Sequence, residues 1–308
     1  MPKLTNIFNV LITNMGMDEK PDKDQEEHHL HALREWLERQ EYLPQNINDT
    51  FLKRFLNCCN NSVETAKGLI DLCFTIRSQT PEIFENRDPL SPSIQNIIKT
   101  SDMVPLPNYT DNNYQVFIYR LCDPDPDKFV YADSLKTFFM FSDLRMLTDI
   151  NLPDGEVPIF DMSGLCLRHI SKVSLHLLKK YMQYTQEAHP VRLKQIHIIN
   201  TPSFVDKMML LIKPFLKNET GRMMHFHSSD LSTLYEYVPK DLLPEEYGGE
   251  SGKLSDLKSQ LTQKLINNRD LFLDETRWKV DESKRPVKDN KSKQLFGIEG
   301  SFRSLSID

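Results

Sequence analysis

Four short apolar segments, separated by longer helical ones, constrain the fold of this chain most strongly. Each has the length and the aliphatic or aromatic content of a buried strand: QVFIYR (115–120), VPIFDM (157–162), QIHIIN (195–200) and RMMHFH (222–227). Between them, residues 132–147, 171–188 and 203–213 have the periodicity of helices. Strands that alternate with helices predict an α/β fold with a mainly parallel sheet and crossover helices.

The residues that precede this region have a purely helical pattern. Leu30, Leu33 and Leu37 form one narrow apolar stripe. Asp49 and Asn61 are candidate N-caps of two further helices. The pattern predicts a small bundle of helices, which ends where prolines become frequent.

The chain therefore divides into four parts. We expect a flexible N-terminus (1–25), an N-terminal helical domain (26–100), an α/β domain (105–250), and a C-terminal helix with a polar tail (251–308). The last helix is expected at 253–272, and the polar tail is expected to wrap the surface or stay loose.

The composition argues against a nucleic-acid partner and against secretion. The net charge is −6, and the five cysteines, an odd number, include the adjacent Cys58 and Cys59, which cannot easily bridge each other. The N-terminus has one short apolar run and no small-residue cleavage site. No apolar run approaches the roughly 20 residues of a membrane span. We expect a reduced, cytoplasmic protein that meets membranes only from outside.

Two motifs that would indicate a nucleotide or a metal ion are incomplete. The segment GGESGKL (248–254) is similar to a phosphate-binding loop, but Tyr247 stands where its first glycine should be and Leu254 replaces the metal-binding hydroxyl. The segment DPDPDK (123–128) has the acidic spacing of a calcium loop, but Lys128 replaces the required glycine. We expect neither site.

No motif of catalysis or of metal binding is complete. His225 and His227 lie on one face of a predicted strand, as zinc ligands would, but no third ligand is indicated, and structural histidines are the favoured interpretation. Neither a nucleophile elbow nor a metalloprotease helix is present. We expect no metal, no cofactor and no enzymatic activity.

The helix predicted at 132–147 has an unusually apolar face. Leu135, Phe138, Phe139, Ser142 and Met146 follow the helical period. For any one of these residues, core packing is about as probable as contact with a ligand.

The next helix has a face that mixes apolar and hydroxyl groups. It is formed by Val173, Leu177, Tyr181, Tyr184 and Thr185. A pure core seldom contains so many hydroxyls, because each one needs a hydrogen-bond partner when buried. A cavity with a few polar anchors explains this composition better.

The helix predicted at 203–213 is apolar on two sides. One stripe contains Phe204, Met208, Leu211, Ile212 and Phe215, and an offset stripe contains Val205, Met209 and Leu216. A surface helix normally has only one apolar face. Either the helix is buried on both sides, or one side faces the interior and the other, with Val205 and Met209, is exposed and contacts other surfaces intermittently.

Three blocks of the sequence resemble the CRAL-TRIO family of lipid carriers. Residues 51–84 are similar to the helical module of the family, and IFDMSG (159–164) to its central strand. The segment IHIINTPSFVDKMMLLIKPFL (196–216), followed by LPEEYGGE (243–250), is similar to its gating helix and its closing turn. The resemblance spans roughly residues 26–270, in the order and spacing of the family.

The resemblance implies a closed apolar cavity between sheet and helices, with residues 203–213 as a lid. It implies non-covalent binding of one retinoid, tocopherol, carotenoid or related lipid. Phe138 stands where a tocopherol-binding member has a small hydroxyl residue, so a tighter pocket is expected. The expected ligand contacts are Leu135, Phe138, Phe139, Ser142, Phe160, Met162, Val173, Leu177, Tyr181, Tyr184, Thr185, Ile196, Ile198, Phe204, Met208, Leu211 and Ile212. Among them, Ser142, Tyr184 or Thr185 is expected to bind the polar end of the ligand.

Only about half of the basic positions that bind anionic lipid head groups in the family have a counterpart in this sequence. Arg192 and Lys194 match basic positions of the family, the basic residues expected after the lid are missing, and Lys217 and Arg222 lie nearby as substitutes. We expect weak or selective contact with membranes, including phosphoinositides. Two alternatives to a lipid carrier remain. The first is a ligand-free CRAL-TRIO scaffold for protein or phosphoinositide interaction, in which Phe138 and Phe139 fill the cavity. The second is an enzyme, which would need a nucleophile beside His169 or His189.

Overall fold

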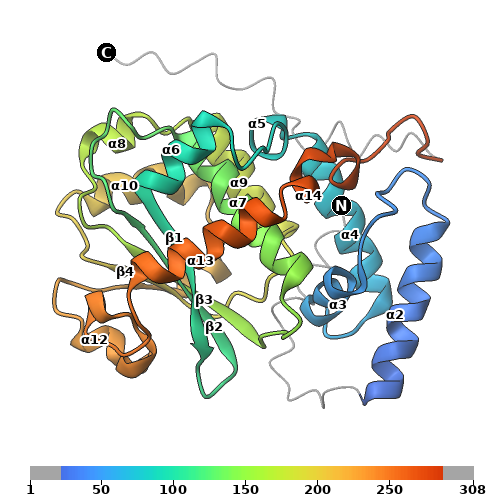
Figure 1. Ribbon diagram of the computed structural model, residues 1–308, viewed down its shortest axis with the longest axis horizontal. Coiled ribbons are helices and arrows are strands. Elements are labelled where there is room, and N and C mark those ends of the chain that lie inside the picture. Colours follow the sequence, from blue (N-terminus) through green and yellow to red (C-terminus); the bar gives the residue numbers. More distant parts are fainter. Residues whose placement is uncertain (1–21, 287–308) are drawn as a thin grey trace.

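A five-stranded sheet organises the computed structural model, which describes residues 22–286 (Figure 1). The strands are β1 (Ser101–Tyr109), β2 (Tyr114–Leu121), β3 (Gly155–Asp161), β4 (Ile196–Ile199) and β5 (Met224–Phe226), and they neighbour one another in that order. β1 pairs with β2 antiparallel, and the other pairs are parallel. The predicted α/β fold with a mainly parallel sheet is confirmed.

In the part of the chain that the structure describes, five helices precede the sheet. They are α2 (Lys23–Glu38), α3 (Asp49–Cys58), α4 (Val63–Ser78), α5 (Pro81–Phe84) and α6 (Pro92–Thr100). The N-caps lie one residue from the predicted ones: Asn48 accepts a hydrogen bond from the amide of Phe51, and Ser62 accepts one from that of Thr65. In Figure 1, α2, α3 and α4 lie together on the side of the molecule away from α12.

The remaining helices connect or follow the strands. They are α7 (Tyr131–Thr148), α8 (Leu167–Ser171), α9 (Leu175–Glu187), α10 (Val205–Ile212), α11 (Asn218–Arg222), α12 (Ser232–Tyr235), α13 (Leu254–Asn267) and α14 (Asp270–Leu273). Short 3₁₀ turns are η1 (Lys213–Phe215), η2 (Lys240–Leu242), η3 (Glu245–Tyr247) and η4 (Glu275–Arg277). The helix predicted at 171–188 begins later, at Leu175, and the short α8 precedes it as a separate helix. Ser174 caps the second and longer one by accepting a hydrogen bond from the amide of Leu177.

Strand β1 was not predicted from the sequence, because Pro105 and Pro107 indicate a turn or linker. Proline cannot donate a hydrogen bond to a sheet, so it is tolerated mainly at an edge. β1 is the edge strand, and its pairing with β2 is irregular between Pro105 and Tyr109. Helix α13 packs against β1 and crosses in front of the sheet in Figure 1.

The two faces of the sheet have different neighbours. Side chains of alternating positions, such as Val116, Ile118, Val157 and Ile159, form an apolar core with α13 and the segment around α12. A larger core joins the N-terminal helices to α7 and α9. This core continues across residue 100, and the domain boundaries stay a prediction.

A closing turn connects the sheet to α13. Gly248 has a φ of 74°, and a Cβ at Gly249 would lie 1.9 Å from the carbonyl oxygen of Leu243. Tyr247 donates a hydrogen bond of 2.8 Å to Asp161 at the end of β3. The paired glycines are therefore required by the close approach of the chain, and the turn is bound to the central strand.

A buried ionic cluster joins the N-terminal helices to α7. Arg77 on α4 binds both carboxylate oxygens of Asp143 on α7, with N–O distances of 2.6 and 2.8 Å, and Arg87 binds the same carboxylate at 2.5 Å. All three side chains are buried. Burial alone would raise the pKa of Asp143, but the two guanidinium groups hold it below its ordinary value.

The C-terminal segment packs on this cluster. Trp278 is 1% exposed, and the Arg87 guanidinium lies 4.3 Å from the centre of its ring. Arg285 pairs with Asp71 on α4, with an N–O distance of 2.7 Å. Of the two alternatives expected for the tail, residues 274–286 therefore follow the first, because they pack on the protein and are not loose. Residues 287–308, and residues 1–21 of the predicted flexible N-terminus, lie outside the described chain.

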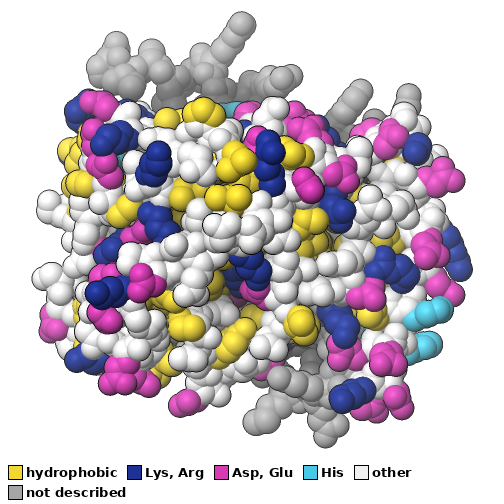
Figure 2. All heavy atoms as spheres, viewed as in Figure 1, with side chains coloured by type: hydrophobic (Ala, Val, Ile, Leu, Met, Phe, Trp, Pro, Cys, Tyr) yellow, Lys and Arg dark blue, Asp and Glu magenta, His cyan; other side chains and the backbone are white. Residues whose placement is uncertain are grey.

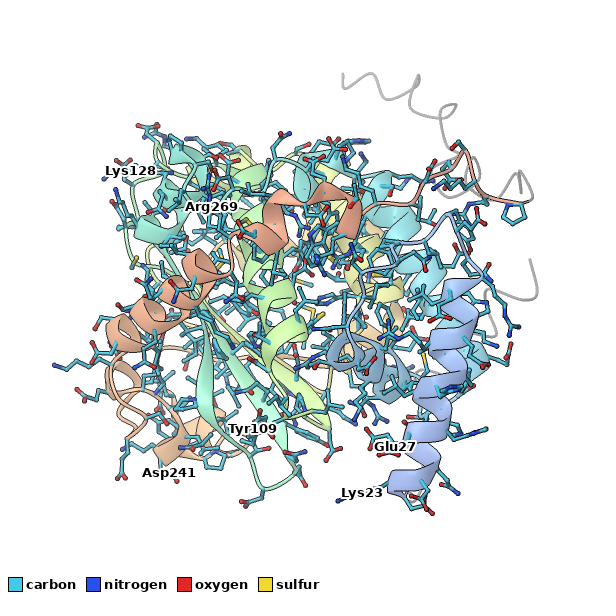
Figure 3. The ribbon with its side chains drawn as sticks, turned by 45° about the vertical axis from the view of Figure 1, so that its right-hand side comes forward. Lys23, Glu27, Tyr109, Lys128, Asp241 and Arg269 are labelled. Carbon is cyan, nitrogen blue, oxygen red and sulfur yellow. The ribbon has the colours of Figure 1, made fainter. Side chains whose placement is uncertain are left out.

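Arg269, labelled in Figure 3, gives the C-terminal helices a second attachment. Its Nε and Nη2 atoms each donate a hydrogen bond of 2.7 Å to the carboxylate of Asp88, which precedes α6. This bidentate pair fixes the start of α14 to the N-terminal helices.

We predict that Asp143→Asn lowers the free energy of unfolding by about 3–5 kcal/mol, because two buried guanidinium groups lose their counter-charge. Urea denaturation measures the change. The control is Asp127→Asn, which removes an ion pair with Arg168. The side chain of Asp127 is 68% exposed and that of Arg168 is 66% exposed. This control should cost less than about 1 kcal/mol, and equal effects would contradict the prediction.

Candidate functional site

A cavity of about 610 Å³ lies between the sheet and the helices. Its walls come from the side of the sheet opposite α13, from α7 and α9, and from α10, which closes it. Most of the lining is apolar, and the volume is in the range of small-molecule sites. The cavity also touches Cys58 and Leu69, so α3 and α4 contribute to its wall.

The sheet forms the floor of the cavity. Phe117 and Tyr119 of β2 and Phe160 of β3 point into it, while their neighbours Val116 and Ile118 lie in the opposite core. The rings of Tyr119 and Phe160 are stacked, with centroids 5.1 Å apart. Ile196 and Ile198 of β4 follow the same alternation, as expected from a pleated strand.

Helix α7 contributes a narrower face than the sequence suggested. Tyr131, Leu135 and Phe138, spaced by one and two turns, line the cavity. Phe139 is fully buried in the larger core, where its ring lies 5.1 Å from that of Phe84. Ser142 is also outside the lining, and its Oγ forms a hydrogen bond of 3.0 Å with Nε2 of His189.

Helix α9 also turns only part of its predicted face toward the cavity. Tyr181, Met182 and Thr185 line the cavity, whereas Leu177 and Tyr184 face the core. Tyr184 accepts a hydrogen bond of 2.7 Å from Nε of Arg77. The hydroxyl of Tyr184 therefore belongs to the buried ionic cluster rather than to the cavity.

Helix α10 has both of its apolar stripes on the cavity side. Val205, Met208 and Met209 all line the cavity. The prediction that Val205 and Met209 face outward was wrong, because the short helix sits over the cavity rim with about half of its circumference turned inward. Lys207 and Leu210 face outward, and Leu210 is 70% exposed.

Of the expected ligand contacts, twelve residues lie around the cavity: Leu135, Phe138, Phe160, Met162, Val173, Tyr181, Thr185, Ile196, Ile198, Met208, Leu211 and Ile212. Five lie outside its lining: Phe139, Ser142, Leu177, Tyr184 and Phe204. The helical period identified the right helices, but it could not say which part of a broad apolar face meets the cavity and which part meets the core.

Several lining residues were missed, among them Phe117, Tyr119 and Tyr131. The signal for the first two was the alternation within QVFIYR, which puts Phe117 and Tyr119 on one face. Tyr131 lies four residues before Leu135, one turn along the same helical face.

The expected hydroxyl anchors are occupied within the protein. Ser142 is bonded to His189, and Tyr184 to Arg77. Thr185 donates a hydrogen bond of 3.0 Å to the carbonyl oxygen of Tyr181 in its own helix. Ser142 and Tyr184 also lie outside the lining, whereas Thr185 lines the cavity and its oxygen can still accept a hydrogen bond, so of the three only Thr185 stays a candidate anchor.

The four cations of the expected head-group site differ in their exposure and in their partners. Arg192 and Lys194 line the cavity near the start of β3, and Arg192 donates a hydrogen bond to Asn60. Lys217 pairs with Glu187 at 2.8 Å, and Arg222 is exposed on α11. Figure 2 shows acidic and basic side chains interspersed on the face that it draws.

Two histidines do have a potential nucleophile beside them, which the sequence did not indicate. They are His189, next to Ser142, and His169, whose Nδ1 lies 3.2 Å from Sγ of Cys166. A catalytic imidazole also needs an orienting acid, and no carboxylate hydrogen-bonds either ring in the described chain. Burial lowers the pKa of His189 to about 3, which makes it a weak base.

The strand histidines lie on the face of the sheet that is turned away from the cavity. His197 Nδ1 and His227 Nε2 are 2.9 Å apart, and Nδ1 of His227 contacts the Thr233 hydroxyl at 2.8 Å. His225 stacks on His197, with ring centroids 5.2 Å apart. Among residues 22–286, no group of three or more histidine, cysteine or acidic side chains is arranged to hold a metal ion.

The geometry of the cavity agrees with the comparison to known families. The family model of the CRAL/TRIO domain matches residues 99–249, and that of the Pinta-like UBA domain matches residues 22–94. Residues 99–249 are a CRAL-TRIO domain. The family resemblance predicted from the sequence is thus confirmed.

Curated relatives match most of the chain. Alpha-tocopherol transfer protein-like of Mus musculus is 27% identical over 227 residues, which cover 72% of this chain and 65% of the relative. Clavesin-2 of Mus musculus is 25% identical over 243 residues, which cover 79% of this chain and 73% of the relative. The crystal structure of Sfh5 aligns with a TM-score of 0.47 at 18% identity, over 80% of this chain and 99% of that chain.

Between residues 22 and 286, no helix of this CRAL-TRIO chain has the length and apolarity needed to cross a membrane.

We predict that the protein loses stability as the pH falls from 6.5 to 5. Burial lowers the pKa of both His189 and His197 to about 3, whereas an unfolded histidine titrates near ~6.5. The unfolded state then binds more protons in this range, so the free energy of unfolding decreases as the pH falls. Urea denaturation at several pH values measures the slope.

In His189→Gln the slope should be smaller, because one of the two titrating groups is removed. His31→Gln is the matched control, since His31 is exposed on α2. A slope that is the same in the wild type and in His189→Gln would contradict the assignment.

Proposed function

We propose that this chain carries one small hydrophobic ligand, such as a retinoid, a tocopherol or a carotenoid, and exchanges it at membrane surfaces. The cavity under α10 carries this proposal, because it is mostly apolar, partly covered by one short helix, and large enough for a small lipid. A permanently open apolar cleft of this kind would expose too much apolar surface, so a lid is needed. The names of the tocopherol-transfer-like relatives support a lipid as the cargo.

The energetics favour such a ligand. Burial of about 400 Å² of apolar ligand surface contributes roughly 10 kcal/mol before the costs of binding. The aromatic floor formed by Phe117, Tyr119 and Phe160 suits a flat or conjugated molecule.

The alternative is a scaffold whose cavity is filled by its own side chains. Phe138 and Phe139 were the candidates for this filling. Phe139 packs in the core, Phe138 forms part of the wall, and about 610 Å³ still remains open. The open volume favours a carrier over a filled scaffold.

The test of this function is extraction of the purified protein with organic solvent, followed by mass spectrometry. We expect one lipid per chain. The control is Ile198→Trp, which places a bulky ring on the floor of the cavity and should exclude the ligand. If no lipid is extracted, and retinoids, tocopherols, sterols and phospholipids all fail to bind, the scaffold is the better function.

Carriage is favoured over catalysis by the state of the candidate nucleophiles. Ser142 lies outside the lining of the cavity, and so does Cys166. Each contacts a histidine that lacks an acidic partner. A bound lipid ester would therefore meet no activated nucleophile in the described chain.

We further propose only weak recognition of anionic head groups. Arg192, Lys194 and Lys217 are engaged with the protein or lie along the cavity, and Arg222 is exposed. Attraction to an anionic membrane surface would then come from a few separated cations and would decrease with salt.

The lid is proposed to contact membranes through Leu210. This residue is 70% exposed and lies between Lys207 and Lys213 on the outer side of α10. Pro202 before the helix and Pro214 after it limit the helix to a short segment that can move as a unit.

We predict that Leu210→Asp slows ligand transfer to vesicles by about tenfold, because insertion of one leucine contributes about 1.5–3 kcal/mol. Affinity at equilibrium and thermal stability should not change, since the side chain is exposed when the lid is closed. Transfer is measured with vesicles with and without phosphoinositide. The control is Ile150→Asp, at an 88% exposed position outside the lid. If both variants transfer ligand at the wild-type rate, Leu210 is not the membrane contact.

A further inference from the structure

Three tyrosines of the cavity wall have hydroxyl groups without a partner in the protein. They are Tyr119 on β2, Tyr131 at the start of α7 and Tyr181 on α9. None of these hydroxyls forms a hydrogen bond with any residue from 22 to 286. They are also absent from the polar atoms that are fully enclosed by protein. Each hydroxyl therefore has access to open space, and all three side chains border the same cavity.

The buried tyrosines outside the cavity behave differently. Tyr42 donates a hydrogen bond to Asp71, Tyr184 accepts one from Arg77, and Tyr247 donates one to Asp161. A phenol can donate one hydrogen bond and accept others, and buried phenols normally do so. The hydroxyls of Tyr119, Tyr131 and Tyr181 lack such partners in the described chain although they border the cavity, which indicates that a ligand supplies them.

The three phenols lie near one another. The ring of Phe138 is 5.2 Å from that of Tyr119 and 6.2 Å from that of Tyr181, so Phe138 separates the two. Tyr131 lies on the same face of α7 as Phe138, two turns earlier. A negative charge on Tyr181 would raise the pKa of both Tyr119 and Tyr131, which agrees with this proximity.

The phenols and the charged residues of the cavity wall lie along the same strands. Tyr119 pairs with Phe160 near the end of β3, whereas Glu156 lies at its start and Arg192 bonds to the backbone there. Burial raises the pKa of Tyr119 and Tyr181, so both stay neutral at physiological pH. A neutral phenol donates one hydrogen bond and accepts others, so a hydroxyl or carbonyl oxygen of a lipid can satisfy it.

We propose that Tyr119, Tyr131 and Tyr181 form the polar end of the ligand site, and that the ligand is a lipid with a hydroxyl or carbonyl oxygen at that end. This inference rests on the proposed carrier function and narrows its cargo. A pure hydrocarbon would displace water from the phenols and leave them without partners, which disfavours its binding. A lipid alcohol, phenol, ketone or quinone replaces those hydrogen bonds.

The test compares ligands that differ in one oxygen. Delipidated protein is titrated with retinol and with anhydroretinol, and separately with 1-pyrenemethanol and 1-methylpyrene, and binding is followed by the fluorescence of each probe. We expect the wild type to bind the oxygenated member of a pair about tenfold more tightly. In the combined variant Tyr119→Phe, Tyr131→Phe and Tyr181→Phe, this preference should disappear, with binding of the hydrocarbon unchanged to within about twofold.

Two control variants separate this role from a structural one. Tyr109→Phe removes a hydroxyl outside the cavity, at the lower end of the strands in Figure 3, and should leave both affinities unchanged. Tyr184→Phe removes a hydroxyl that is bonded to Arg77, so it should lower the melting temperature. The combined variant should melt at or above the wild-type temperature, because its three hydroxyls have no partner in the unliganded protein. If the combined variant does not fold, the three single variants are compared in the same assay.

The outcomes distinguish this proposal from the carrier function. Binding of both members of a pair with equal affinity, or a preference that survives the three substitutions, overturns the role of the tyrosines and leaves the carrier function intact. Failure of the wild type to bind any of the four probes, together with no lipid in the extract, overturns both.

Discussion

The carboxylate of Asp143 is the point on which the arrangement of the cavity depends. It binds Arg77 and Arg87, and Arg77 in turn donates to Tyr184. These bonds join α4, the segment between α5 and α6, α7 and α9. Because α7 and α9 are two walls of the cavity, the N-terminal helices position those walls although they supply few lining residues themselves. Trp278 shields the cluster from water, so the C-terminal segment belongs to the same unit.

One face of the sheet packs in a core, and the other face lines the cavity. On one face, Val116 and Ile118 meet α13 and the closing turn, and the core there is complete. On the other face, Phe117 and Tyr119 meet a volume that no side chain fills. The same strand therefore supplies stability through one set of alternating residues and a ligand surface through the other. A closed lid over such a volume is consistent with a carrier, which must hold its cargo away from water and release it only at an acceptor.

Polar groups around the cavity belong to two kinds. Ser142, Tyr184 and Thr185 are bonded within the protein and stabilise the walls. Tyr119, Tyr131 and Tyr181 have no such partner. Both kinds look alike in a sequence, since each is a hydroxyl on an otherwise apolar face. The difference lies in which partner is within reach once the helices have packed, and this accounts for the reassignment of the polar anchors.

The sequence by itself determined the alternation of strands and helices, the family, the short apolar helix beside the cavity and the aromatic helices of the cavity, because these follow from periodicity and from short motifs. Strand β1 escaped prediction because Pro105 and Pro107 resemble a turn until an edge position accommodates them. Only the tertiary structure decided how α7, α9 and α10 are oriented about their own axes, and therefore which of their side chains face the cavity. A broad apolar face can turn either of its halves toward a cavity, and distant partners select between them: Phe84 for Phe139, Arg77 for Tyr184, and the cavity rim for Val205 and Met209.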